Sequence, residues 1–232
     1  MSIELLELAA VTLEDLLGEV VFIGGATVTL WITDPGAPPV RPTKDVDVVV
    51  DVTTRSGFHD FEASLRERRF AEDQQAGVIC RWLHSDSGLI LDAMPADASI
   101  LGFANRWQGA ALPHAVARTL PSVPSSAPSR RHTCWPPSLR RSRAAVAAIF
   151  GQPRFGDIIA LVDGREELVD EVEAVGADVR GYLTEEVREL MGASRFLDGL
   201  FGALRPDAAS QDRADLIVLP ALRAIAGHNE RP

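Results

Sequence analysis

The spacing of apolar residues divides the chain into a mixed first half and a helical last third. Residues 2–18 carry apolar side chains at helical spacing, which predicts an amphipathic helix. The β-branched run 19–23 predicts a short strand, and the valine-rich run 45–52 predicts the clearest strand of the chain. Further helices are expected at 26–32, 58–69, 166–175, 184–201 and 212–226, and further strands at 78–83 and 89–93.

The region around residues 118–153 lacks this order. It is rich in Ser, Pro and Arg and has no convincing periodicity before Ala144. We therefore expect a core at 1–118, an irregular segment at 119–154 and a helical region at 155–232. The expected fold class is α+β, a mixed β-sheet flanked by helices and followed by a mostly helical C-terminal part.

Composition narrows the class of protein. The chain of 232 residues is 46% hydrophobic and 24% charged, which is typical of a globular protein, and no apolar stretch approaches the length of a membrane span. The acidic N-terminus lacks the basic region of a secretory signal, and Cys80 and Cys134 suggest no disulfide framework, so we expect a cytoplasmic protein. A net charge of −10 argues against a broad nucleic-acid-binding face.

Two carboxylates, Asp45 and Asp47, lie two residues apart on the predicted valine-rich strand, so both side chains point to one face. Like charges this close need a cation, and Mg²⁺ prefers carboxylate and phosphate oxygens. Asp92, at the end of the strand 89–93, is placed to complete a two-metal site. A lone Asp-x-Asp is more often solvated than catalytic, and the hypothesis depends on the order of all the elements.

The pair Gly24-Gly25 separates a predicted strand from a predicted helix. Backbone N–H groups at such a helix start are exposed to an anion, because glycine has no side chain to cover them. Thr27 would add a hydroxyl donor. The order strand, Gly-Gly, helix, Asp-x-Asp strand, helix, hairpin and Asp is more specific than any one of these features.

These residues resemble a known family. The runs Phe22-Ile23-Gly24-Gly25-Ala26-Thr27 and Arg41 to Val48, with Leu91 to Pro95 and Ile100 to Trp107, are similar to AbiEii-type nucleotidyltransferases, which include the MenT toxins of toxin–antitoxin and abortive-infection systems. This family belongs to the DNA polymerase β-like superfamily. The resemblance covers about residues 20–118 well and 155–200 loosely.

The resemblance implies a nucleotidyltransferase fold and Mg²⁺-dependent transfer of an NMP from an NTP to an acceptor hydroxyl. In the MenT branch the acceptor is the 3′ end of tRNA, so another RNA end and a cognate antitoxin are further expected partners. Gly24 and Gly25 would hold the triphosphate, Asp45 and Asp47 would bind two metals with Asp92, and Asp92 would help to activate the acceptor. Asp157 fits a later acidic motif, as a nucleotide-binding residue.

The chain departs from the family where a lysine-bearing helix is expected, because its only lysine is Lys44. One hypothesis is a frameshift: the codons of Arg130 to Phe150, read two bases later, can spell a lysine-containing motif. The alternative is a divergent linker. A nucleotidyltransferase that modifies a small molecule, and a catalytically impaired member that binds a nucleotide or a partner protein, therefore stay open as other functions.

Overall fold

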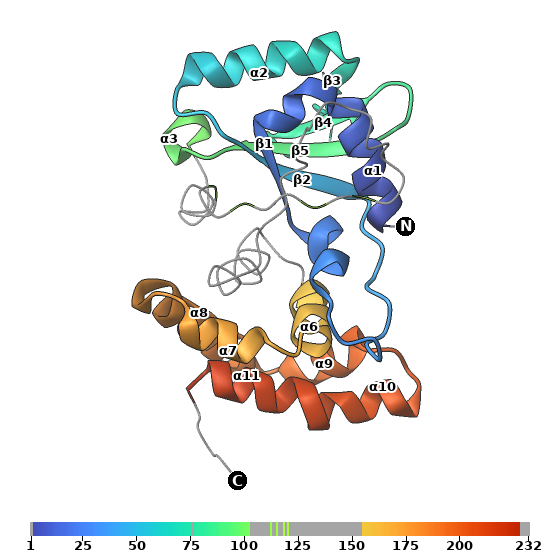
Figure 1. The fold of residues 1–232 in the computed structure, drawn as a ribbon, viewed down its shortest axis with the longest axis vertical. Helices are drawn as coiled ribbons and strands as arrows, with labels where there is room; N and C mark the ends of the chain where they lie inside the picture. Colours follow the sequence, from blue (N-terminus) through green and yellow to red (C-terminus); the bar gives the residue numbers. More distant parts are fainter. Residues whose placement is uncertain are drawn as a thin grey trace. The chain divides into compact units, whose positions relative to one another are not determined.

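A computed structural model describes residues 2–75, 77–102 and 155–227, together with 112, 115, 118 and 120. The chain forms two compact units (Figure 1), one of Met1–Thr27 and Pro42–Ser138 and the other of Val28–Arg41 and Leu139–Pro232. The segment Val28–Arg41, expected in the N-terminal core, thus packs with the C-terminal part. The expected irregular segment 119–154 lies outside the described residues except for Leu120, and the hypotheses about it stay predictions.

The first unit contains a five-stranded sheet with helices beside it (Figure 1). Its described elements are α1 (Ser2–Leu13), the 3-10 helix η1 (Glu14–Gly18), β1 (Val20–Ile23), β2 (Asp45–Val50), α2 (Arg55–Glu67), β3 (Phe70–Glu72), β4 (Arg81–His84), β5 (Ile90–Pro95) and α3 (Ala98–Leu101). The strand order is β1-β2-β5-β4-β3. Strands β2 and β5 are parallel and the other pairs are antiparallel, so the expected mixed sheet is confirmed.

Local features mark the start of α2 and the end of α1. The side-chain hydroxyl of Thr54 accepts a hydrogen bond from the N–H of Gly57 and so caps α2, whose Phe58, Phe61 and Leu65 are buried. Helix α1 ends where Glu14 adopts a φ of 48°, five residues before the end we expected for this helix. The expected strand 78–83 begins only at Arg81.

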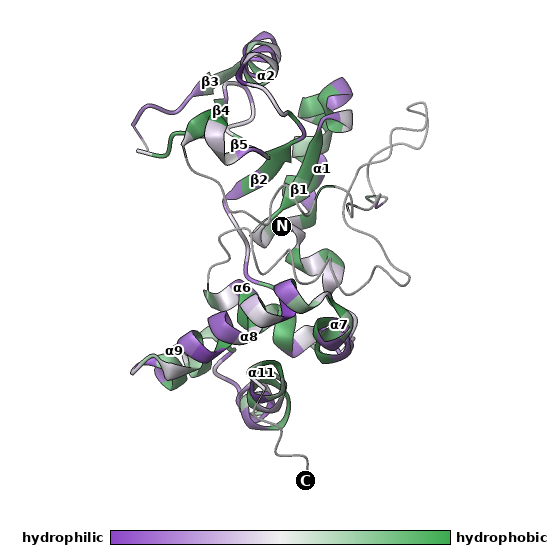
Figure 2. Ribbon diagram, turned by 90° about the vertical axis from the view of Figure 1, so that its left-hand side faces the viewer, coloured by the Kyte–Doolittle hydropathy of each residue, from purple (hydrophilic) through white to green (hydrophobic). Residues whose placement is uncertain are grey.

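The two faces of β2 differ in burial. Val46, Val48 and Val50 are fully buried on one face, as Leu91 and Ala93 are on the neighbouring β5. Figure 2 shows the apolar character of β1 and β2. The other face of the sheet carries Asp45, Asp47 and Val49 on β2, because side chains alternate along a strand. The face with Val46, Val48 and Val50 is fully buried, whereas the other face is buried at Val49 and partly exposed at Asp45 and Asp47.

From Phe155 onward, the second unit is helical over its described residues, as expected. Its helices are α6 (Phe155–Gly164), α7 (Leu168–Ala174), α8 (Ala177–Gly192), α9 (Phe196–Ala203), α10 (Ala208–Arg213), the π-helical turn η4 (Ala214–Val218) and α11 (Leu219–Ile225). The expected helix 184–201 is wrong as a single helix, because Ala193 has extended backbone (ψ 133°) and separates α8 from α9. The expected helix 212–226 contains the π-helical turn just before Pro220, which lacks an N–H group.

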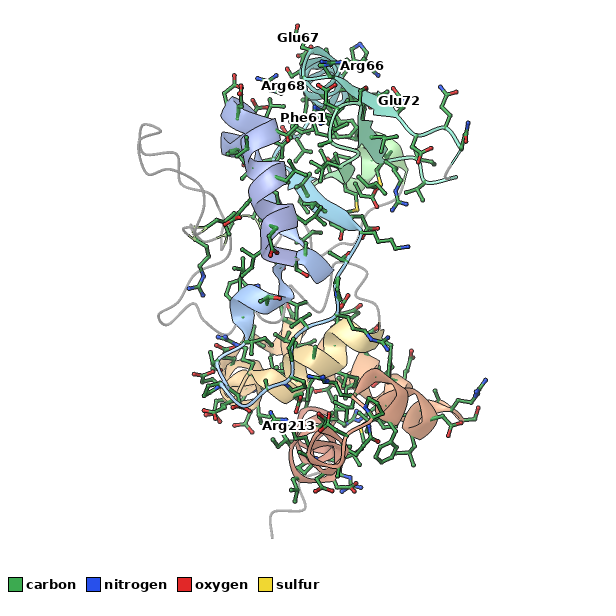
Figure 3. All side chains as sticks on the ribbon, turned by 90° about the vertical axis from the view of Figure 1, so that its right-hand side faces the viewer. Phe61, Arg66, Glu67, Arg68, Glu72 and Arg213 are labelled. Carbon is green, nitrogen blue, oxygen red and sulfur yellow. The ribbon has the colours of Figure 1, made fainter. Side chains whose placement is uncertain are left out.

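Two arginines hold the segment Val28–Arg41 onto these helices. Arg165 donates to the carbonyl of Trp31 and forms a buried ion pair with Glu171. Arg213, labelled in Figure 3, donates both to Asp34 and to Asp163. The hydrogen bond from Arg213 lowers the pKa of Asp34, whereas burial raises the pKa of Asp163. Among the described residues, no helix is long and apolar enough to cross a bilayer.

Candidate active site

The three predicted carboxylates lie on one face of the sheet. Asp45 and Asp47 are two residues apart on β2, and Asp47 is directly opposite Asp92 in the parallel pairing of β2 with β5. The sequence alone could not show this register. The side chains of Asp45 and Asp92 are 14% and 10% exposed, so the acidic end of this face is neither sealed nor freely solvated.

Arg81 joins two of these carboxylates and was not foreseen from the sequence. It lies on β4 opposite Asp92 in the antiparallel pairing of β4 with β5. Its Nε donates to Asp92 Oδ1 at 2.8 Å, and its Nη2 donates to Asp92 Oδ2 at 2.7 Å and to Asp45 Oδ2 at 3.0 Å. The only sequence signal was an arginine within the predicted strand 78–83, which comes just before the Asp92 strand.

The hydrogen bonds of Asp92 are the main cause of a raised pKa at Arg81, which therefore stays protonated. The other oxygen of Asp45 accepts a hydrogen bond from the hydroxyl of Thr43 at 2.7 Å. Both oxygens of Asp45 and both oxygens of Asp92 are thus hydrogen-bonded.

Gly24 comes directly after β1 and contacts the third carboxylate. Strand β1 ends with Ile23 opposite Asp47, and Gly24 then turns the chain with a φ of 71°. A Cβ atom on Gly24 would lie 2.3 Å from Asp47 Oδ2. Glycine is therefore required at this position for two reasons, the left-handed backbone and the close approach of Asp47.

The helix expected after the glycines is present as the 3-10 helix η2 (Gly25–Trp31). Thr27 is buried, and its hydroxyl donates to the carbonyl of Gly24 at 2.8 Å. The backbone N–H of Thr27 donates to the same carbonyl at 3.1 Å. In this conformation the one hydroxyl proton of Thr27 stabilises the glycine turn, so it is not offered to a ligand.

Asp157 belongs to the second unit, in the first turn of α6. The carboxylates of Asp45, Asp47 and Asp92 all belong to the first unit. The structure thus brings these three together with Gly24, and it leaves the nucleotide-binding role of Asp157 a prediction.

An apolar cluster continues the acidic face of the sheet. Its buried members are Val21, Ile23, Val49, Cys80 and Met94. Burial, and then the charge of Asp92, raise the pKa of the Cys80 thiol to about 11. Cys80 is therefore a protonated packing residue at neutral pH and not a nucleophile.

The donor atoms do not form a preformed two-metal site. Within the described part of the chain, no group of three or more His, Cys, Asp or Glu side chains is arranged to hold a metal ion. Arg81 takes up oxygens of Asp45 and Asp92 that such a site would use. The residue types suit Mg²⁺ shared with a phosphate ligand, but their present arrangement suits a guanidinium.

Comparison with solved structures gives a distant likeness. No protein-family model matches the chain, and no curated protein matches it significantly. A solved structure, the crystal structure of JHP933 from Helicobacter pylori, is similar at 11% identity with a TM-score of 0.44, over 98% of this chain and 91% of that chain. The function of this chain therefore has to be inferred from its own residues.

Proposed function

We propose that this protein is a nucleotidyltransferase that transfers an NMP from an NTP to an acceptor hydroxyl, with an RNA or tRNA 3′ end as the acceptor. The observation that carries the proposal is the convergence of Asp45, Asp47 and Asp92 on one sheet face, with Gly24 against Asp47. The resemblance to AbiEii-type enzymes adds the expectation of a cytoplasmic toxin with a cognate antitoxin.

The proposed reaction is a displacement at the α-phosphorus. The acceptor oxygen forms a bond to phosphorus, the bond to the bridging oxygen breaks, and pyrophosphate leaves. Mg²⁺ belongs to this proposal as the counter-ion that arrives with the triphosphate, since it is commonly held by one or two carboxylates together with phosphates. The acceptor proton needs a base, and Asp92 has to exchange its hydrogen bonds with Arg81 before it serves as one.

The glycine turn has a separate role in the proposal. The space that a side chain on Gly24 would fill is taken by the carboxylate of Asp47, so a triphosphate would reach this turn through a cation that Asp47 holds. The strands β2 and β5 are held by a parallel ladder, which fixes Asp47 and Asp92 next to each other before any substrate binds.

The test is label transfer from each α-labelled NTP to total RNA, to purified tRNA and to a panel of small hydroxyl-bearing molecules. Asp47→Ala should reduce transfer about 10²–10³-fold, the range found when one stabilising group is removed from an active site. Asp51→Ala is the matched control, because Asp51 is exposed directly after the same strand. Full transfer by both Asp45→Ala and Asp47→Ala would refute the proposed site.

A second candidate is a catalytically impaired member that binds nucleotide or a partner protein. The engagement of Asp45 and Asp92 by Arg81, and a chain whose only lysine is Lys44, both favour it. Calorimetry with Mg²⁺ and each NTP separates the two candidates. If a nucleotide binds but no acceptor is labelled in the transfer assay, the protein is the catalytically impaired member. If only a small molecule is labelled, the acceptor is that small molecule and not RNA.

A further inference from the structure

Arg81 lies between two of the carboxylates that the proposed function assigns to a metal ion. Its planar guanidinium makes a two-bond fork with Asp92 and a third hydrogen bond with Asp45, all between 2.7 and 3.0 Å. Forked arginine–carboxylate pairs of this kind are stronger than single charged hydrogen bonds. Arg81 is therefore the resident counter-ion of these carboxylates.

A divalent cation can compete with Arg81 for the carboxylate oxygens. Arg81 brings a single positive charge to Asp45 and Asp92. A divalent cation brings twice the charge of a guanidinium, and its small radius allows closer contact with oxygen. It can therefore replace Arg81 when phosphate oxygens complete its coordination.

Arg81 can leave its position only by moving. A guanidinium stays charged in proteins, so deprotonation does not free it near neutral pH. Its side chain is 20% exposed, which leaves part of it in contact with solvent. Rotation of a long, partly exposed side chain requires no change in the strands that hold it.

We propose that Arg81 is a built-in competitor of the divalent cation, which holds Asp45 and Asp92 in the empty protein and is displaced when a cation arrives with the triphosphate. This inference rests on the proposed nucleotide site. It assigns to Arg81 a positioning and gating role, because Arg81 keeps the carboxylates assembled and prevents tight metal binding without nucleotide.

The test is Mn²⁺ binding to the full chain without nucleotide, measured by calorimetry and by the shift of the melting temperature. Arg81→Gln should bind Mn²⁺ at least about tenfold more tightly than the unmodified protein, because one positive charge and three hydrogen bonds no longer compete. Without metal this variant should melt at a lower temperature, and saturating Mn²⁺ should restore most of the loss.

Lys44→Gln is the control for charge alone, since Lys44 is exposed and adjacent to Asp45 in the sequence. It should change Mn²⁺ affinity less than about twofold, as expected for a solvated charge. Adding Asp92→Asn to Arg81→Gln should remove the gain in affinity. Arg81→Lys keeps the positive charge but loses the two-bond fork with Asp92, so its Mn²⁺ affinity should lie between those of the unmodified protein and Arg81→Gln. This variant tests the inference if Arg81→Gln does not fold.

An Arg81→Gln protein that binds Mn²⁺ no more tightly than the unmodified protein would overturn the inference, and so would a Lys44→Gln protein that gains as much. These outcomes are independent of catalysis. Suppose that Mn²⁺ restores the melting temperature of Arg81→Gln, but neither the unmodified protein nor any variant transfers label. The proposed function then fails, and the competition between Arg81 and the cation stands. If Asp47→Ala abolishes transfer while Arg81→Gln gains no affinity, the function stands and the competition fails.

Discussion

Gly24 is the residue at which the end of a strand meets the candidate site. Its positive φ turns the chain at the end of β1, and its missing side chain lets Asp47 approach the backbone. Gly88, in the turn between β4 and β5, has a similar φ of 69° but no atom within 4 Å of the position of a Cβ. A comparison of Gly24 with Gly88 therefore distinguishes the cost of a left-handed backbone from the cost of the contact with Asp47.

Gly24→Ala should destabilise the protein more than Gly88→Ala does. Each alanine costs about 1–2 kcal/mol because it is held in the left-handed region. The Gly24 variant must also displace the carboxylate of Asp47, and its nucleotide binding should fall with its stability. Urea unfolding followed by circular dichroism measures both variants, and equal losses would show that the contact with Asp47 is unimportant.

At the scale of elements, the segment Val28–Arg41 is part of the helical unit although it follows the first strand in sequence. The Arg165–Glu171 pair carries part of this docking, because both side chains are less than 8% exposed and Arg165 also donates to Trp31. A buried charge that loses its partner is costly, whereas replacing both charges by apolar groups is often neutral.

Glu171→Ala should therefore cost about 3–5 kcal/mol of unfolding free energy, since it leaves the Arg165 charge buried and short of its main partner. The double variant Arg165→Met with Glu171→Leu should recover most of that loss. Asp198→Ala, which breaks an exposed pair with Arg195, should leave the urea midpoint unchanged. If the single and double variants lose the same free energy, packing rather than the ion pair holds this element.

At the scale of the whole molecule, the net charge of −10 limits the ways in which RNA can bind. Binding along a strand depends on neutralising many phosphates, which an acidic protein does poorly. The proposed acceptor contact is therefore confined to one end of the RNA.

We expect a single-stranded RNA of about twenty nucleotides to bind with a Kd no tighter than about 10⁻⁴ M in 0.15 M salt, the weak limit of non-specific binding. Filter binding over a range of salt concentrations measures this. Micromolar binding with a steep salt dependence would instead indicate an extended basic surface, and the arginines of residues 119–154 would be the first to replace.

The amino-acid pattern predicted much of the fold. The valine run of β2, the apolar strands β1 and β5, and the capped helix α2 each have a local signal strong enough to place them within a few residues. β3 was missed because three residues carry no periodicity, and the break between α8 and α9 was missed because the apolar spacing continues across it.

The order of residues was enough to predict which groups belong to the site, namely a glycine turn after one strand, the Asp45–Asp47 pair on the next and Asp92 on a later strand. Their positions relative to one another depend on how the strands pair in the folded sheet. The parallel pairing of β2 with β5 sets Asp47 beside Asp92, and the antiparallel pairing of β4 sets Arg81 against both Asp92 and Asp45. Strand order and register arise from long-range packing of the sheet, which no local pattern encodes. For that reason the carboxylates were predicted from the sequence, and the arginine that binds two of them was found only in the fold.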